Sequence, residues 1–126
     1  MYSVVFDKTC GIIRCRIDGF LSDNEVGLII APTGAAKETC KRLHGDMKML
    51  VTSDGQVQSM EIMKMVANQR ASDVGIYDPR AFVLPTSLQK LQVGRVFNLS
   101  TEKHFISENA AIMWLLANRE NRLPQV

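Results

Sequence analysis

The chain has 126 residues, the usual length of one domain, and its 46% hydrophobic and 22% charged residues indicate a globular protein rather than a disordered or fibrous one. A formal net charge of +2 without a clustered run of Lys and Arg, together with only 6% aromatic residues, argues against nucleic-acid binding. We predict a single domain over residues 1–118 and a frayed tail over residues 119–126.

Two short β-rich runs, residues 2–7 and 11–18, are separated by a few residues and predict a hairpin. In the second run, three apolar residues alternate with three charged ones. This alternation predicts that one face of the second strand is open to water, so helices should not cover it on both sides.

A long helix is predicted within residues 19–45. Ser22 and Glu25 have the spacing of a capping box, in which the hydroxyl and the carboxylate accept hydrogen bonds from free backbone N–H groups at the helix start. Pro32 lacks a backbone donor, so we expect a kink or a break there. Gly45 is expected to end the helix as a left-handed cap.

The middle of the chain predicts a strand, a turn and a helix. Residues 47–51 are typical of a buried strand, and Asp54 and Gly55 end it in a turn. An amphipathic helix then begins at Ser59. A further strand is expected over residues 73–77.

The last third predicts a helix over residues 81–92, with Pro85 in its first turn, and a final strand over residues 95–99. A closing helix should begin at Ser107, whose hydroxyl can cap it.

The closing helix is expected to bury one face, with Ile106 packing on Ala111 at its start as a hydrophobic staple. The residues predicted to be buried on this helix are Ala110, Met113, Trp114 and Ala117.

The predicted order is therefore β-β-α-β-α-β-α-β-α, an α/β fold. After the hairpin each strand follows a helix, so right-handed crossovers should give a mixed, mostly parallel five-stranded sheet. The first strand is expected to be antiparallel at an edge, and the helices to pack mainly on one face.

This pattern resembles the STAS domain of bacterial anti-anti-sigma factors, and more closely the small bacterial proteins described as STAS-like or CRAL-TRIO-related. The element order carries the resemblance over nearly the whole chain. Three stretches add to it: "MLVTSDGQVQSMEIM", "SDVGIYDPRAFVLPTSLQ", and "GRVFNLS" followed by "ENAAIMWLL".

The resemblance implies a candidate phosphoacceptor. In phosphorylated members of the family, a strand ends near an Asp and the acceptor Ser begins the next helix. By position Ser59 matches the acceptor, and Thr52 or Asp54 lies near the strand-end carboxylate. The residues alone favour a plainer interpretation, in which Ser59 is a helix cap and Ser53 and Asp54 form a turn.

Met60 and Met65 fall outside the apolar face predicted for the second helix. If they are exposed, their adaptable side chains would define a surface for a protein partner or a second copy of the chain. The edge strand is a second candidate for a homodimer contact.

No residue pattern indicates catalysis or a metal. Cys40 and His44 are four residues apart on the first helix, but two ligands are too few for a metal site. His104 is interpreted as a solvated loop residue. Thiol-based sensing by Cys10 or Cys15 is a weaker hypothesis.

We therefore expect a non-enzymatic regulatory or protein-interaction domain that presents residues 52–59 and the second helix to a protein partner and needs no cofactor. The alternative, which the CRAL-TRIO resemblance implies, is a protein that binds an apolar small molecule or lipid, with Pro32 and Gly34 opening the first helix as a gate. The chain length argues against a large cavity.

The location expected from the sequence is cytoplasmic. The first residues lack the pattern of a signal peptide, and no apolar run reaches the roughly 18 residues of a membrane span, so membrane insertion is not expected. Three cysteines, an odd number, fit reduced thiols.

Overall fold

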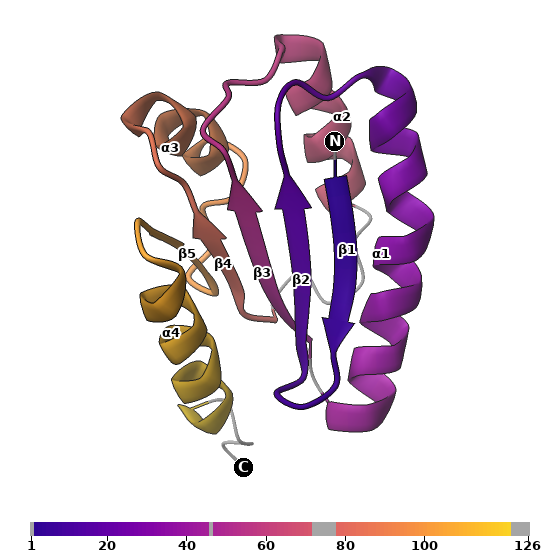
Figure 1. Ribbon diagram of the computed structural model, residues 1–126, viewed down its shortest axis with the longest axis vertical. Helices are drawn as coiled ribbons and strands as arrows, with labels where there is room; N and C mark the ends of the chain where they lie inside the picture. Colours follow the sequence, from indigo (N-terminus) through magenta and orange to yellow (C-terminus); the bar gives the residue numbers. More distant parts are fainter. Residues whose placement is uncertain (1, 46, 72–77, 122–126) are drawn as a thin grey trace.

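The computed structural model describes residues 2–45, 47–71 and 78–121. These ranges form an α/β domain with the predicted order of elements (Figure 1). The elements are β1 (Tyr2–Asp7), β2 (Ile12–Ile17), α1 (Asp23–His44), β3 (Lys48–Ser53), α2 (Met60–Ala71), β4 (Arg80–Val83), α3 (Ser87–Gly94), β5 (Glu102–Phe105) and α4 (Glu108–Asn121).

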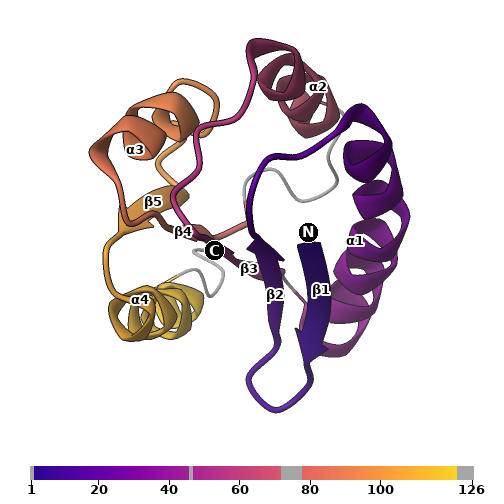
Figure 2. The ribbon, with the colours of Figure 1, turned by 45° about the horizontal axis from the view of Figure 1, so that its top comes forward.

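The strands lie in the sheet in chain order, β1-β2-β3-β4-β5. β1 and β2 are antiparallel, and every later pair is parallel, so the predicted mixed sheet with an antiparallel edge is confirmed. When consecutive parallel strands are neighbours, crossovers of one hand place all their helices on the same face. Figure 2 accordingly shows α2 and α3 across the sheet from α4, which follows the last strand.

Each face of the sheet has its own apolar cluster. Beneath α4, Leu50 of β3 and Ala81 of β4 pack against Ala111 and Leu115. On the opposite face the apolar residues divide into two groups, one near the start of the strands and one between α1 and α2. The first group is Ile13, Cys40, Met47 and Met49, and the second is Leu21, Val26 and Ile62.

The predicted ends of α1 are confirmed. Ser22 and Glu25 form the capping box, and Gly45 has a φ of 80° with its N–H bonded to the Lys41 carbonyl at 2.8 Å. The helix continues through Pro32, so the expected break there is wrong. A proline's φ of about −65° is helical, and the caps at both ends stabilise the rest of the helix.

The prediction of a helix over residues 81–92 is wrong in its first half. Arg80–Val83 is β4, and α3 begins at Ser87 with Thr86 as its N-cap, so Pro85 precedes the helix. The short apolar run has no intrinsic preference strong enough to resist pairing with β3. The strand predicted over residues 73–77 lies outside the described residues.

The last strand is also displaced from its predicted position. Residues 95–99 follow α3 as a turn and irregular backbone, and the strand is Glu102–Phe105 instead. Three of its four residues are polar, so it lacks the alternation that announces a strand. Its identity comes from pairing with β4, in register from Arg80 opposite Glu102 to Val83 opposite Phe105.

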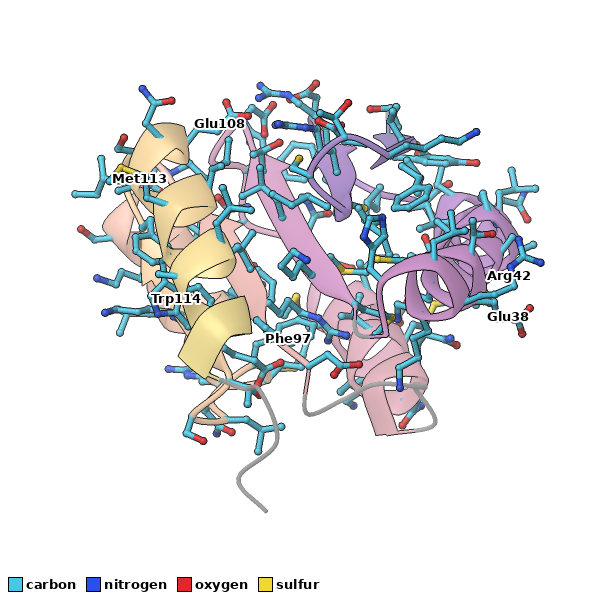
Figure 3. All side chains as sticks on the ribbon, turned by 90° about the horizontal axis from the view of Figure 1, so that it is seen from below. Glu38, Arg42, Phe97, Glu108, Met113 and Trp114 are labelled. Carbon is cyan, nitrogen blue, oxygen red and sulfur yellow. The ribbon has the colours of Figure 1, made fainter. Side chains whose placement is uncertain are left out.

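α4 begins after Ser107 as predicted, with the Ser107 carbonyl accepting from Ala111 N–H at 3.1 Å. The predicted buried face is wrong, because Ala110, Met113 and Ala117 are exposed and Trp114 is only partly buried. Met113 points away from the sheet in Figure 3.

The expected staple between Ile106 and Ala111 is also wrong, since the Ile106 side chain is 85% exposed. α4 extends to Asn121, three residues into the segment expected to be a frayed tail. Residues 122–126 lie outside the described ranges. One face of β2 is open to water past the end of α4, as predicted. Arg16 is exposed there and pairs with Asp18 at 3.0 Å.

Candidate functional site

A cavity of about 320 Å³ lies between the sheet and the helices α1, α2 and α3. Its floor is a row of the sheet in which Cys15, Val51 and Phe82 are neighbours on β2, β3 and β4. Ile29 of α1 and Val66 of α2 are among the apolar side chains of its walls. Its size is at the lower end of the range for small-molecule sites, about 300–1,000 Å³.

The separation of two apolar clusters explains where the cavity lies. α1 packs closely on the sheet through Cys40 and Met49, near the start of the strands. At its other end α1 packs on α2 through Val26 and Ile62. The cavity is lined by Met49 from the first cluster and Val26 from the second, so it occupies the space between them.

Three buried polar side chains line this mostly apolar cavity: Lys37 of α1, Arg80 of β4 and Gln89 of α3. Lys37 and Thr33 are one helical turn apart and so share a face of α1. Polar groups enclosed in an apolar site fix the orientation of whatever binds there.

Arg80 is held by the strand beside it. Its guanidinium forms an ion pair with Glu102 of β5, with Nη1 and Oε2 3.7 Å apart, and lies 5.6 Å from the ring centroid of Phe97. Phe97, labelled in Figure 3, also packs on Phe82, with ring centroids 4.7 Å apart. Arg80 is therefore a fixed part of the cavity wall.

Cys15 contributes the thiol of the cavity floor. Burial raises the pKa of this thiol to about 11, against the opposing influence of the Lys37 and Arg80 charges. A thiol with this pKa is protonated at neutral pH, so it is a weak nucleophile. Cys15 therefore acts in the wall as a small apolar side chain.

Gln89 connects the cavity to the loop between β3 and α2. Its amide nitrogen donates to Ser53 Oγ at 2.6 Å and to the Gln56 carbonyl at 3.1 Å. Its carbonyl oxygen is buried and has no hydrogen-bond partner among the described residues. The Thr33 hydroxyl on α1 is in the same situation.

The predicted site residues 52–54 have structural roles at the end of β3 and in the turn that follows it. Thr52 is buried in β3. Ser53 Oγ accepts from Gly55 N–H at 3.3 Å, and Asp54 accepts from Gln56 N–H at 3.2 Å, as the turn interpretation predicted. Asp54 also accepts from Gly19 N–H at 2.8 Å, which ties the loop to the segment before α1.

Ser59 lies at the start of α2, where its hydroxyl accepts from Ile62 N–H at 3.2 Å. The structure thus places Ser59 as the predicted helix cap. Its side chain is exposed. A phosphate on this hydroxyl would lie at the positive end of the helix dipole.

The two candidate surface methionines have different environments. Met60 is 77% exposed at the start of α2, whereas Met65 packs against the cluster that contains Ile62. Phe20 and Val57 are exposed beside the same loop. We refer to Phe20, Val57 and Met60 as the loop patch.

Other residues singled out in the sequence have local roles. The Cys40 thiol donates to the Gly11 carbonyl at 3.3 Å, and His44 packs edge-on against Phe6. Within the described ranges, no group of three His, Cys, Asp or Glu residues is arranged to hold a metal ion. In the same ranges, no helix has both the length and the hydropathy needed to span a membrane.

The interpretation of His104 as a solvated loop residue is wrong. His104 lies on β5, and its ring stacks on Phe82 with centroids 5.3 Å apart. Burial, with a smaller influence of Lys90, lowers the pKa of its imidazole. The prediction failed because the mostly polar residues 102–105 do not have the sequence pattern of a strand.

The polar residues of the cavity were not predicted from the sequence. Lys37 offered a signal, because it continues the helical spacing of the buried residues Val26 and Cys40. A lysine in an apolar stripe is unusual, since lysine is rarely buried without a partner. Gln89 offered none, because the expected helix there had the wrong start.

Comparison of the chain with models of protein families, with curated proteins and with solved structures finds no match.

Proposed function

We propose that the protein is a non-enzymatic binding domain that holds a compact, mostly apolar small molecule between the sheet and the helices α1–α3. The observation that carries this proposal is the cavity of about 320 Å³, with apolar walls and a few buried polar side chains. This combination is typical of small-ligand sites. The volume favours a ligand smaller than a long-chain lipid.

Further support comes from the chemistry of the walls. Burial raises the pKa of the Cys15 thiol in the cavity wall to about 11, so this thiol is better suited to packing than to a reaction. The free cysteines at positions 10, 15 and 40 fit a reducing compartment, so the proposal places the protein in the cytoplasm. The element order supports a STAS-like relationship as part of the same proposal.

A dye titration tests the binding proposal. The apolar fluorophore N-phenyl-1-naphthylamine should bind the wild-type protein saturably. Val51→Phe adds a ring at the cavity floor and should weaken binding by at least about tenfold. Val5→Phe makes the same change at an exposed position of β1 and should leave binding unchanged. Equal binding by both variants, or no saturable binding, would refute the proposal.

A native ligand is sought separately by native mass spectrometry of protein purified from its own cells. A bound species present in wild-type protein and lost from Val51→Phe would support the proposal. A species carried equally by both proteins would lie outside the cavity.

A second candidate function is docking of a protein partner on the loop patch of Phe20, Val57 and Met60. The specific observation is that three apolar side chains are exposed around a loop whose backbone is held by side-chain hydrogen bonds. Exposed apolar residues on a rigid frame suit a protein contact. Edge strand β1 and α2 remain candidates for a homodimer.

The docking proposal is tested with matched charge variants. Met60→Lys adds a charge to the loop patch, and Leu43→Lys adds one to an exposed position of α1. A protein recovered from native extract by the wild type and Leu43→Lys, but not by Met60→Lys, would support docking there. The same preparations, analysed by mass spectrometry, test phosphorylation of Ser59. If Met60→Lys recovers the same protein as the wild type, docking at the loop patch is refuted.

A further inference from the structure

Gln89 has a buried hydrogen-bond acceptor at the cavity wall. The residue is only 4% exposed and lines the cavity from the first turn of α3. Its Oε1 has no hydrogen-bond partner among the described residues. Buried polar atoms are nearly always hydrogen-bonded, so such an atom at a ligand cavity indicates a place for a ligand group.

The orientation of this amide is fixed by its other contacts. The Gln56 carbonyl can only accept a hydrogen bond, so the atom 3.1 Å from it must be the amide nitrogen of Gln89. Ser53 Oγ lies 2.6 Å from the same nitrogen. Both N–H groups are therefore used, and the group left over is an acceptor.

We propose that Gln89 Oε1 recognises the ligand, and that the ligand is a neutral, largely apolar molecule bearing a hydroxyl group, such as an alcohol or a phenol. This inference rests on the proposed binding function. A hydroxyl supplies the donor that Gln89 Oε1 lacks.

A carboxylate is the main competing ligand class, because Lys37 and Arg80 lie in the same walls. Arg80 already pairs with Glu102 and contacts Phe97. A carboxylate carries no proton for Gln89 Oε1 and would place negative charge against that carbonyl dipole. The Gln89 environment therefore favours the hydroxyl, and the two classes are separated by experiment.

Three naphthalene probes of similar shape test this assignment by displacement of the dye. 2-Naphthol has the donor, 2-methoxynaphthalene lacks it, and 2-naphthoate carries a negative charge. Wild-type protein should bind 2-naphthol about tenfold or more tighter than 2-methoxynaphthalene, since the methyl ether leaves the buried acceptor unsatisfied. The 2-naphthoate anion should bind more weakly than 2-naphthol.

Two variants locate the preference. Gln89→Met keeps the length of the side chain and removes the carbonyl, so the preference for 2-naphthol should fall to about twofold or less while 2-methoxynaphthalene still binds. Met113→Ala changes an exposed position of α4 outside the cavity, so the preference should persist. Circular dichroism checks that both variants are folded.

The outcomes separate the two proposals. If the dye does not bind saturably, displacement by the probes cannot be measured and the binding function fails. If the dye binds but wild-type protein does not distinguish 2-naphthol from its methyl ether, only the role of Gln89 fails. Tighter binding of 2-naphthoate overturns the hydroxyl class, and this wild-type comparison decides the matter even if Gln89→Met does not fold.

Discussion

The buried ion pair between Arg80 and Glu102 joins β4 to β5, and its contribution to the stability of the fold can be measured. The Glu102 side chain is completely buried, and its Oε1 accepts from Leu99 N–H at 2.9 Å while Oε2 faces Arg80 at 3.7 Å. Glu102→Gln keeps an oxygen for Leu99 but removes the negative charge beside Arg80. Breaking one side of a buried pair costs about 3–5 kcal/mol.

The lower end of this range is expected for Glu102→Gln, because Arg80 keeps its contact with the Phe97 ring. A loss of about 3 kcal/mol corresponds to a fall in Tm of roughly 12 °C for a domain of this size. The double variant Arg80→Met/Glu102→Gln leaves no buried charge at this position. It should therefore lose less than the sum of the two single variants.

The assay is urea unfolding followed by circular dichroism, with the slopes compared to check that the transitions remain two-state. Glu108→Gln provides the matched control, because Glu108 pairs with Arg14 at 3.1 Å on the exposed surface. That change should cost less than about 1 kcal/mol. If Glu102→Gln costs no more than the control, or if the single effects simply add, the pair does not hold the strands as argued.

Three further predictions concern the core, the buried imidazole and the thiol. Leu115→Ala should destabilise the fold by about 3 kcal/mol, because Leu115 is fully buried. Met113→Ala, at a 70% exposed position, should change the free energy of unfolding by less than about 0.5 kcal/mol. Similar values for the two variants in urea titrations would contradict the observed buried face of α4. Burial lowers the pKa of His104, so its neutral form stabilises the fold above the unfolded-state pKa of 6.5, and this contribution is lost as the pH falls from 6.5 through the lower folded pKa. Stability measured between pH 7 and 5 should fall less in His104→Phe than in wild type, and parallel curves would exclude this role. Cys15, with a pKa of about 11, should resist iodoacetamide at pH 8 until the protein is unfolded, and rapid labelling of the native protein detected by mass spectrometry would show that the thiol is accessible.

The order of elements and the arrangement of the sheet were predictable because their signals are local. The capping residues Ser22, Gly45, Ser59 and Ser107 each act on backbone groups within a few positions, and all four mark helix ends in the structure. Once the order alternates, the handedness of crossovers leaves few arrangements of a parallel sheet.

The positions of β4 and β5 were not predictable, because neighbouring strands define them. Arg80 and Glu102 place charges inside strands, where a sequence pattern predicts apolar residues. These charges are accommodated since they lie directly opposite each other. Residues 95–99 have the composition of a strand, yet Phe97 serves instead as a packing partner of Phe82.

The buried face of α4 was ambiguous for a different reason. Residues 110–117 are all apolar, so spacing alone does not distinguish one face from another. The observed face is the one that places the small Ala111 against the sheet and Leu115 beside Leu50 and Ala81. Shape complementarity with the sheet decides this, and a sequence pattern does not contain it.

The candidate site was the least predictable part, because its polar contacts join residues far apart in the chain. Gln58 and Gln92 exchange hydrogen bonds between the loop and α3, with Gln58 N–H donating to Gln92 Oε1 at 2.9 Å and Gln92 Nε2 donating to the Gln58 carbonyl at 2.6 Å. The side chain of Gln58 in turn bonds to Gly19 and Leu21. A sequence identifies these glutamines only as ordinary polar residues.

These amide contacts also relate the two candidate functions. Gln89 and Gln92 of α3 hold the loop between β3 and α2, and that loop carries Val57 of the loop patch. A ligand bonded to Gln89 Oε1 would restrain the same side chain that bonds to Gln56, and would therefore favour the loop arrangement that keeps this bond. The effect must be reciprocal in free energy: a ligand that strengthens binding of a partner at the loop patch is itself bound more tightly in the presence of that partner.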